Sequence, residues 1–357
     1  MSGAGGIEIL TSGVALGVHV PGLLLRDRLR DRGARARVTV LERLLPAAKL
    51  ATTEAMKLAF HRDFRVALVG QKVARSPVDV VPGDRLDALF ADWAGRDARR
   101  FVVFSGYWLP VVARYAARRD DVEVVACRVD SATSPSFAGR AADAARLVRL
   151  ADADAGTLPA TIPVSRDAPV PWRERERALL LHGGGWGMGT YRDRVDELRA
   201  HGYALDVVVH EEADAVVDDP AVRYHLIDPR WHPWLDDGYP PLGRLRRGSP
   251  TAYRRGVGHH GSFDLVRTSM AAVAKPGGGT LLDSLWSATP LVFLEPFGDH
   301  ERRNGELWRR LGFGITAQEW RASGCAPDVL AELHRALLGA ARRVPDLTDL
   351  LLSGRLR

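Results

Sequence analysis

A run of three glycines between an apolar segment and a helix-like segment is the feature most suited to chemistry. It lies in VAKPGGGTLLDS (residues 273–284), where Gly277–Gly279 directly precede Thr280. Glycines let the main chain approach a ligand closely, and free N–H groups at a helix N-terminus favour an anion. Asp283 follows in the first helical turn, where a carboxylate suits ribose hydroxyls. The alternative is a plain tight turn in which Asp283 is an ordinary helix-start residue.

A second polar loop, GDHERRN (298–304), follows the next apolar run, PLVFLEP. It concentrates hydrogen-bond donors and acceptors in one place, as a polyhydroxylated ligand requires. Arg302 and Arg303 within it could hold a carboxylate bidentately, which would suit a uronic acid. Two exposed surface arginines are the alternative.

A second glycine-rich loop, GGGWGMG (183–189), follows the apolar run ALLL. It departs from G-x-G-x-x-G because Met188 takes the position of the third glycine. The loop therefore gives little support to a dinucleotide-dependent oxidoreductase. The chain also has no G-x-x-x-x-G-K-[ST] phosphate-binding motif.

Two residues are candidates for a general base. His19, in GVALGVHVPGLLL, follows the first strand-like run, and a neutral imidazole suits proton removal near pH 7. Asp130, at the end of VEVVACRVD, is the rival base or the partner of the histidine. The alternatives are a buried structural histidine and a carboxylate that ends a turn or caps a helix.

Polar and aromatic residues after strand-like runs are expected to form the acceptor side of a cleft. Trp108 could stack on a flat acceptor, or could be a core or loop aromatic. The remaining acceptor candidates are Gly17, Ser105, Gly106, Tyr107 and Ser131. Trp231, Trp234 and Tyr239 are candidates to flank a nucleotide base.

Strand-like runs alternate with helix-length segments, which is typical of parallel α/β structure. The strand-like runs are residues 7–10, 38–41, 101–104, 122–129, 178–181, 205–209, 222–227, 271–275 and 290–296. A helix is expected from about Pro21 to Arg32, and one or two basic helices within 46–75. We expect an N-terminal domain (1–160), a proline-rich linker (161–174), a second domain (175–340) and a C-terminal tail or helix (341–357).

The segment KPGGGTLLDSLWSATPLVFLEPFGDHERRN resembles the donor-binding segment of GT-B glycosyltransferases that use UDP-sugars. It is most similar to the lipid II-forming N-acetylglucosaminyltransferase and monogalactosyldiacylglycerol synthase types, and GGGWGMG is similar to a glycine loop of the latter. The resemblance is specific over about 185–315. It implies an α/β GT-B fold of two Rossmann-like domains facing a cleft, with the nucleotide held by the C-terminal domain.

The resemblance also implies roles for individual residues. Gly278, Gly279 and Thr280 match diphosphate contacts, and Asp283 matches an acidic ribose ligand that is usually glutamate. The loop that reads sugar hydroxyls is matched by Asp299, His300, Glu301 and Asn304, with His300 in place of the usual glutamine. The other donor-side candidates are Gly185, Gly187, Lys275, Gly277 and Arg302. The family pattern G-H-V-x-P-x-L is one residue shorter here between His19 and Pro21, which could re-aim the ring.

A weaker resemblance spans the whole chain. SGVALGVHVPGLLLRDRL, FVVFSGYWLPVV and LLLHGGGWGMG are similar to actinomycete proteins grouped with cytosylglucuronic acid synthase. That resemblance implies a glucuronic acid donor, a small flat acceptor such as cytosine, and antibiotic biosynthesis.

Composition limits the remaining classes. The chain has 357 residues, a net charge of +6 and 46% apolar residues, and its pI near 9.6 favours anionic partners. Two isolated cysteines and the absence of a signal-like or spanning run lead us to expect a cytoplasmic protein. The resemblance to GT-B enzymes implies that no metal is needed, and the only D-x-D, Asp152–Asp154, is interpreted as a solvated pair, so no metal and no cofactor beyond the donor is expected.

The sequence therefore predicts an inverting, metal-independent UDP-sugar glycosyltransferase acting on a small molecule, with a homodimer left open. Three alternatives stay open: a lipid glycosyltransferase docked on a membrane through the basic segment 46–75, a UDP-sugar epimerase, and a non-catalytic sugar-nucleotide-binding partner protein. Nucleic-acid binding is not expected, because no stripe of basic and aromatic residues is present.

Overall fold

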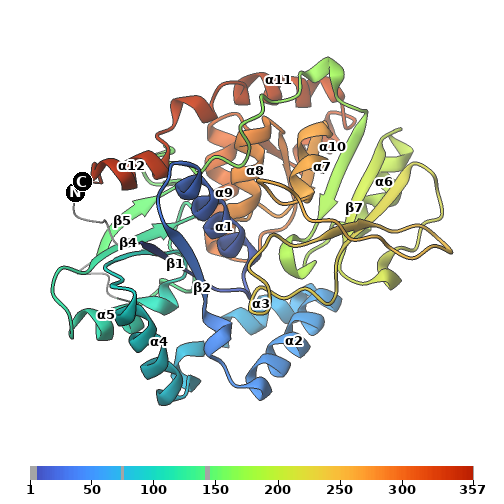
Figure 1. Ribbon diagram of the computed structural model, residues 1–357. Helices are drawn as coiled ribbons and strands as arrows, with labels where there is room; N and C mark the ends of the chain where they lie inside the picture. The colour runs from blue at the N-terminus through green and yellow to red at the C-terminus, as the bar shows by residue number, and fades with distance from the viewer. Residues whose placement is uncertain (1–5, 74–75, 141–144, 357) are drawn as a thin grey trace.

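The computed structural model describes residues 6–73, 76–140 and 145–356. Two sheets with helices on both faces lie side by side, which confirms the expected α/β class (Figure 1). The first sheet contains β1 (Ile7–Thr11), β2 (Ala36–Val40), β3 (Arg100–Val103), β4 (Glu123–Arg128) and β5 (Ala145–Arg149). The second contains β6 (Ala178–His182), β7 (Ala204–Val209), β8 (Val222–Ile227), β9 (Leu242–Arg244), β10 (Ala271–Ala274), β11 (Leu291–Phe293) and β12 (Gly314–Thr316).

The helices lie between the strands in chain order. Those of the first half are α1 (Leu16–Asp31), α2 (Ala47–Arg62), α3 (Phe64–Val73), α4 (Gly83–Gly95) and α5 (Leu109–Ala116). Those of the second half are α6 (Val195–Ala200), α7 (Ser262–Thr268), α8 (Gly278–Ser287), α9 (Asp299–Arg310), α10 (Ala317–Ala322), α11 (Pro327–Leu337) and α12 (Leu347–Ser353). No helix among the described residues is both long and apolar enough to cross a bilayer.

The strand orders define where each half can bind a ligand. The first sheet is parallel in the order β2-β1-β3-β4-β5, and the second has the order β12-β11-β10-β6-β7-β8-β9 with only β9 antiparallel. These are the two common doubly wound arrangements, in which ligands bind beyond the carboxyl ends of the strands where the order reverses. The reversal lies between β1 and β3 in the first sheet and between β6 and β10 in the second.

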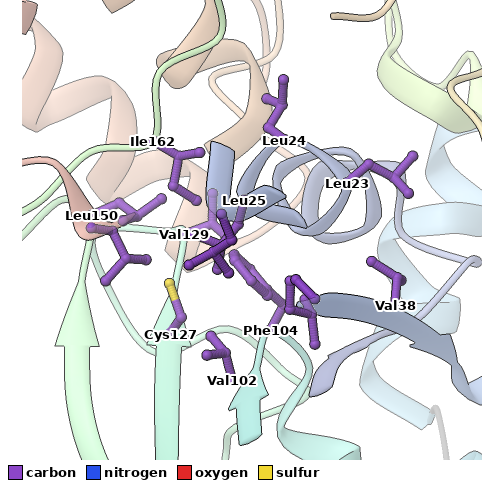
Figure 2. Packing of buried hydrophobic residues seen from close by; sticks show 14 of the residues in the cluster. Leu23, Leu24, Leu25, Val38, Val102, Phe104, Cys127, Val129, Leu150 and Ile162 are labelled. Atoms are coloured by element: carbon purple, nitrogen blue, oxygen red, sulfur yellow. The ribbon is translucent and has the colours of Figure 1, made fainter. Parts of the chain in front are cut away.

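Helix α1 is the central packing element of the first half. Its leucines are buried in one apolar cluster with residues of β1 to β4, and Figure 2 shows Leu25 beside Phe104 and Val129, which follow β3 and β4. Leu282 of α8 belongs to the same apolar cluster. The core of the first half therefore continues into the nucleotide-binding half that the sequence predicts.

The end of the chain returns to the first half. Leu347 and Leu351 of α12 are buried in the same cluster as α1, and Arg32 forms an ion pair with Asp346 at 2.6 Å. In Figure 1 the red α12 accordingly lies near the strands of the first sheet rather than beside α10. Residues 341–356 of the segment expected as a tail or helix thus contact the first half.

One local expectation needs correction. Helix α1 begins at Leu16 rather than near Pro21, so Pro21 lies inside the helix and cannot donate to the carbonyl of Gly17. The proline-rich stretch packs against the first half, because Ile162 and Val164 are fully buried in its core. Both cysteines are buried and unbonded.

Candidate functional site

The main cavity lies between the two halves and has a volume of about 510 Å³. Residues beyond the carboxyl ends of β1, β3 and β4 line one side, and residues beyond β6 and β10 line the other. The predicted site residues that line it are Gly17, Ser105, Tyr107, Asp130, Gly185, Lys275, Gly277, Gly278, Gly279, Thr280, Asp283, His300 and Glu301. The structure thus brings together most of the donor and acceptor candidates at the reversal points of both sheets.

The glycine bend forms the N-terminus of α8 and faces this cavity. Gly277 is the N-cap residue and Gly278 is the first helical residue. A Cβ at Gly278 would lie 2.8 Å from Cγ1 of Val129 and 2.9 Å from Oδ1 of Asp130. One edge of the bend therefore packs against the first half of the chain, so close packing as well as ligand access explains why glycine stands here.

Asp130 binds the bend directly. Its Oδ1 accepts hydrogen bonds from the main-chain N–H of Gly278 at 3.1 Å and from the Asn304 amide at 2.8 Å. A carboxylate from the first half thus lies on a helix N-terminus of the second, where an anion is stabilised.

Asn304 is wrongly predicted as a reader of sugar hydroxyls. Its side chain is fully buried, and it also accepts from the main-chain N–H of Ser131 at 2.7 Å and donates to the carbonyl of Pro276 at 2.9 Å. The amide oxygen and the amide nitrogen are both engaged, and the bonds to Ser131 and Asp130 join the two halves. Ser131, predicted on the acceptor side, belongs to this junction and does not line the cavity.

Lys275 and Glu301 form a buried ion pair in the cavity wall. The Lys275 Nζ lies 3.1 Å from Glu301 Oε1, and Glu301 Oε2 accepts from the main-chain N–H of Phe297 at 2.6 Å. Lys275 follows β10 at the reversal point, so its ammonium group is fixed close to the glycine bend. A carboxylate partner keeps this cation oriented in a site with little solvent.

The outer part of the loop 298–304 does not reach the cavity. Arg302 is half exposed and pairs with Asp299 and Glu306, while Arg303 pairs with Asp154. Asp299 is also exposed, because these residues form the solvent-facing side of the first turns of α9. Asp299, Arg302 and Arg303 therefore do not line the cavity, and their predicted contacts with a donor or a uronate stay predictions.

The loop 183–189 joins the two halves. Gly187 has a left-handed φ of 61°, and its carbonyl accepts from Nδ1 of His61 on α2 at 2.9 Å. A Cβ at Gly185 would lie 2.5 Å from Cγ of Leu16. Gly185 lines the main cavity, whereas Gly187 lines only a smaller one, so its predicted donor contact is not seen.

His19 lies behind the cleft. Its ring is fully buried, Nδ1 lies 3.0 Å from the Thr11 hydroxyl, and Trp231 packs 6.3 Å away between ring centroids. Burial lowers the pKa of the imidazole to about 3, so the ring is neutral. His19 does not line the cavity, and its prediction as the base is wrong for this conformation.

Trp108 is also a correction. Its indole is fully buried among the aromatic residues between β3, α4 and α5, and its N–H donates to the carbonyl of Thr11 at 2.8 Å. It therefore cannot stack on an acceptor. Gly106 is held by close packing, because a Cβ there would lie 2.4 Å from the carbonyl oxygen of Ser136.

A smaller cavity of about 220 Å³ adjoins the main one beyond β7 and β8. Trp231 and Trp234, predicted beside a nucleotide base, line this smaller cavity, together with Lys57 and His210. Tyr239 is buried and donates its hydroxyl to Asp27 at 2.8 Å, so it lines neither cavity.

Three polar residues in the cavity wall were missed from the sequence. His182 ends β6, and burial lowers the pKa of its ring to about 4. Glu42 follows β2 and accepts from the Ser12 hydroxyl and the Gly13 N–H, both at 2.6 Å, while burial raises the pKa of its carboxyl group. His260 lies before α7 and pairs with Asp283. His182 is the last residue of a strand and Glu42 lies two residues after one, positions that could have identified them.

The D-x-D pair lies outside the cavity. Asp152 caps the turn that follows it by accepting from the N–H groups of Asp154 and Ala155, each at 3.0 Å. Across the described ranges, no three His, Cys, Asp or Glu side chains are grouped as metal ligands would be.

Comparison with solved structures identifies the fold. The glycosyltransferase SnogD of Streptomyces nogalater has a TM-score of 0.55 at 15% identity, covering 98% of this chain and 99% of that one. SsfS6 of Streptomyces sp. SF2575, complexed with thymidine diphosphate, has a TM-score of 0.54 at 15% identity, covering 99% and 100%. MurG of Acinetobacter baumannii has a TM-score of 0.54 at 11% identity, covering 99% of each chain. The chain thus has the GT-B fold over nearly its full length.

No protein-family model matches the chain, and no curated protein matches its sequence.

Proposed function

We propose that the protein is a glycosyltransferase that moves a sugar from a UDP-sugar to a small-molecule acceptor without a metal ion. The observation that carries this proposal is the glycine bend at the start of α8, which lines a cavity formed by both halves. A helix N-terminus at the reversal point of a doubly wound sheet is suited to a diphosphate. Similar solved structures are glycosyltransferases, one of them complexed with thymidine diphosphate.

The diphosphate would replace Asp130 at the bend. The Asp130 carboxylate lies on the Gly278 N–H, and a donor diphosphate competes for the same group. Repulsion between the two anions favours movement of the carboxylate when the donor binds. Asn304 still offers a hydrogen bond to Asp130 Oδ1, so the carboxylate stays beside the donor.

The chemistry needs two further charges. When the acceptor attacks the anomeric carbon, the bond from that carbon to the diphosphate oxygen breaks and negative charge gathers on the leaving UDP. Lys275 and the amides of Gly278–Thr280 would stabilise that charge. Asp130 would take the acceptor proton, since it lines the cavity and His19 does not. Direct displacement of this kind inverts the anomeric centre.

The finer form of the proposal is glucuronosyl transfer from UDP-glucuronate to a nucleobase such as cytosine, in natural-product biosynthesis. Its support is the resemblance of three segments described above. Because Arg302 and Arg303 pair with other carboxylates, a donor carboxylate would instead have to be held by cavity cations such as Lys49 or Lys275. Measuring transfer from UDP-glucuronate and from UDP-glucose side by side distinguishes glucuronosyl transfer from the broader proposal of transfer from another UDP-sugar.

Calorimetry with UDP and uridine tests the donor site. UDP should bind, and uridine should bind on the order of 100-fold more weakly, because it lacks the groups that the amides and Lys275 bind. Equal binding of both, or binding of neither, contradicts the proposal. A panel of UDP-sugars with cytosine and other small acceptors, with and without EDTA, then tests transfer. Donor conversion without acceptor would indicate an epimerase, and UDP binding without turnover would indicate a non-catalytic binding protein.

A lipid acceptor is the second candidate, and the exposed face of α2 and α3 is the observation that favours it. Val66 and Val69 of α3 are exposed there, close in sequence to Arg62 and Arg65. Residues 74–75 of the basic segment 46–75 lie outside the described residues. Flotation with vesicles containing anionic lipid separates this candidate from an enzyme that acts in solution.

A further inference from the structure

His260 is a buried histidine in the wall of the main cavity that the reaction proposed above does not use. It lies just before α7, is 6% exposed, and lines the cavity beside Asp283. Both ring nitrogens have partners: Nδ1 lies 2.8 Å from the Ser262 hydroxyl, and Nε2 lies 3.0 Å from Oδ1 of Asp283. The three side chains therefore form one hydrogen-bonded chain along the cavity wall.

The partners fix the position of one proton. A carboxylate oxygen only accepts, so Nε2 must carry the hydrogen that it shares with Asp283. The Ser262 hydroxyl can either donate to Nδ1 or accept from it, and so tolerates both protonation states of the ring. Burial lowers the pKa of His260, but the nearby carboxylates of Asp283 and Asp264 outweigh it and raise the pKa above its ordinary value. His260 thus donates to Asp283 at any pH near neutrality.

This contact determines where the other carboxylate oxygen points. Asp283 lies in the second turn of α8, and its side chain is 16% exposed in the structure. Oδ1 is engaged by His260, whereas Oδ2 has no hydrogen-bond partner among the described residues. Asp283 lines the cavity one helical turn from the glycine bend. One helical turn is comparable to the distance between the diphosphate and the ribose of a nucleotide. A nucleotide whose diphosphate lies at the bend would therefore place its ribose beside Asp283.

We propose that His260 is a positioning residue that holds Asp283 so that its second oxygen reads the ribose diol of the donor nucleotide. The inference rests on the proposed function, since it needs a nucleoside diphosphate at the bend. It makes the site selective for ribonucleotides over deoxyribonucleotides. A fixed acceptor left without its hydroxyl partner penalises the analogue that lacks the hydroxyl.

The test compares the affinities of UDP, 2′-deoxy-UDP and 3′-deoxy-UDP by calorimetry. The unaltered protein should bind UDP on the order of 10- to 100-fold more tightly than either deoxy analogue, as expected for hydrogen bonds to a charged group. His260→Phe keeps a flat ring but cannot donate, so this ratio should fall toward one. His260→Gln restores a donor near the same place and should restore part of the ratio. Asp283→Asn, which removes the charge itself, should abolish it.

His259→Gln is the matched control. His259 is the neighbouring histidine, pairs with Asp264 at 3.0 Å and does not line the main cavity. Its substitution should leave the ratio unchanged.

Three outcomes would overturn the inference: His260→Phe keeps the full ratio, it weakens all three ligands equally, or the unaltered protein binds UDP no more tightly than the deoxy analogues. Failure of the unaltered protein to bind UDP at all would instead reject the proposed function. Should the phenylalanine variant not fold, His260→Asn, whose shorter side chain does not span the gap to Asp283, gives the same comparison.

Discussion

Removal of the Asn304 side chain should weaken the junction between the two halves. Asn304→Ala leaves the Ser131 N–H and the Pro276 carbonyl without the partners they have at 2.7 and 2.9 Å, both in buried surroundings. Asp130 keeps its bond to the Gly278 N–H. Each buried group left unpaired costs about 1–3 kcal/mol, so two of them cost roughly 2–4 kcal/mol when partial relaxation is allowed. For domains of this size that loss lowers Tm by on the order of 10 °C.

Differential scanning calorimetry measures the effect, with Gln318→Ala as the control. Gln318 is an exposed amide on α10, and its removal should change the stability by less than about 0.5 kcal/mol. Small-angle scattering on the same samples should show a larger radius of gyration for Asn304→Ala, because the halves are less firmly joined. An Asn304→Ala protein with the Tm and the radius of the control would refute the reasoning that this side chain fastens the halves together.

Three further predictions concern the bend, a buried histidine and the cavity cation. Gly278→Ala should lower stability by about 1–3 kcal/mol in calorimetry because its Cβ would overlap Val129, whereas Gly83→Ala, with open space around it, should not; equal Tm values would contradict this. The folded pKa of His19, near 3, lies below its unfolded value of 6.5, so stability falls as the pH drops from 6.5 toward 4. His19→Gln should reduce that slope by about 1.4 kcal/mol per pH unit in urea titrations, and an unchanged slope would show that the ring is not buried. Lys275→Met should weaken UDP binding by roughly 10- to 100-fold and leave uridine binding unaltered; equal losses for both ligands would argue against a diphosphate contact.

Much of the architecture was predictable from local patterns. The apolar runs 178–181 and 222–227 lie in β6 and β8, the run 271–275 covers β10 and one residue beyond it, and the glycines at 277–279 lie at a strand–helix junction beside a cavity. These features depend on a few neighbouring residues, which is the range over which hydrophobic periodicity and turn chemistry operate. The rules of doubly wound sheets then place the loops at the cleft.

The errors arise where a side chain's direction or distant partner decides its role. Because α1 starts early, the His19 ring lies against Thr11 and Trp231 rather than in the cleft. Trp108 packs inside an aromatic core. Asn304 bonds to Asp130, 174 residues away in the sequence, and α12 packs on the first half of the chain. Local sequence patterns do not predict either of these long-range contacts. His260 was missed because its significance depends on Asp283, 23 residues further along the chain.

A crystal structure of the protein with UDP tests the central claim most directly. The account predicts the diphosphate within hydrogen-bonding distance of the N–H groups of Gly278, Gly279 and Thr280, with the Asp130 carboxylate moved off the Gly278 N–H that it now occupies. A complex in which Asp130 stays on that N–H while UDP binds elsewhere would contradict it.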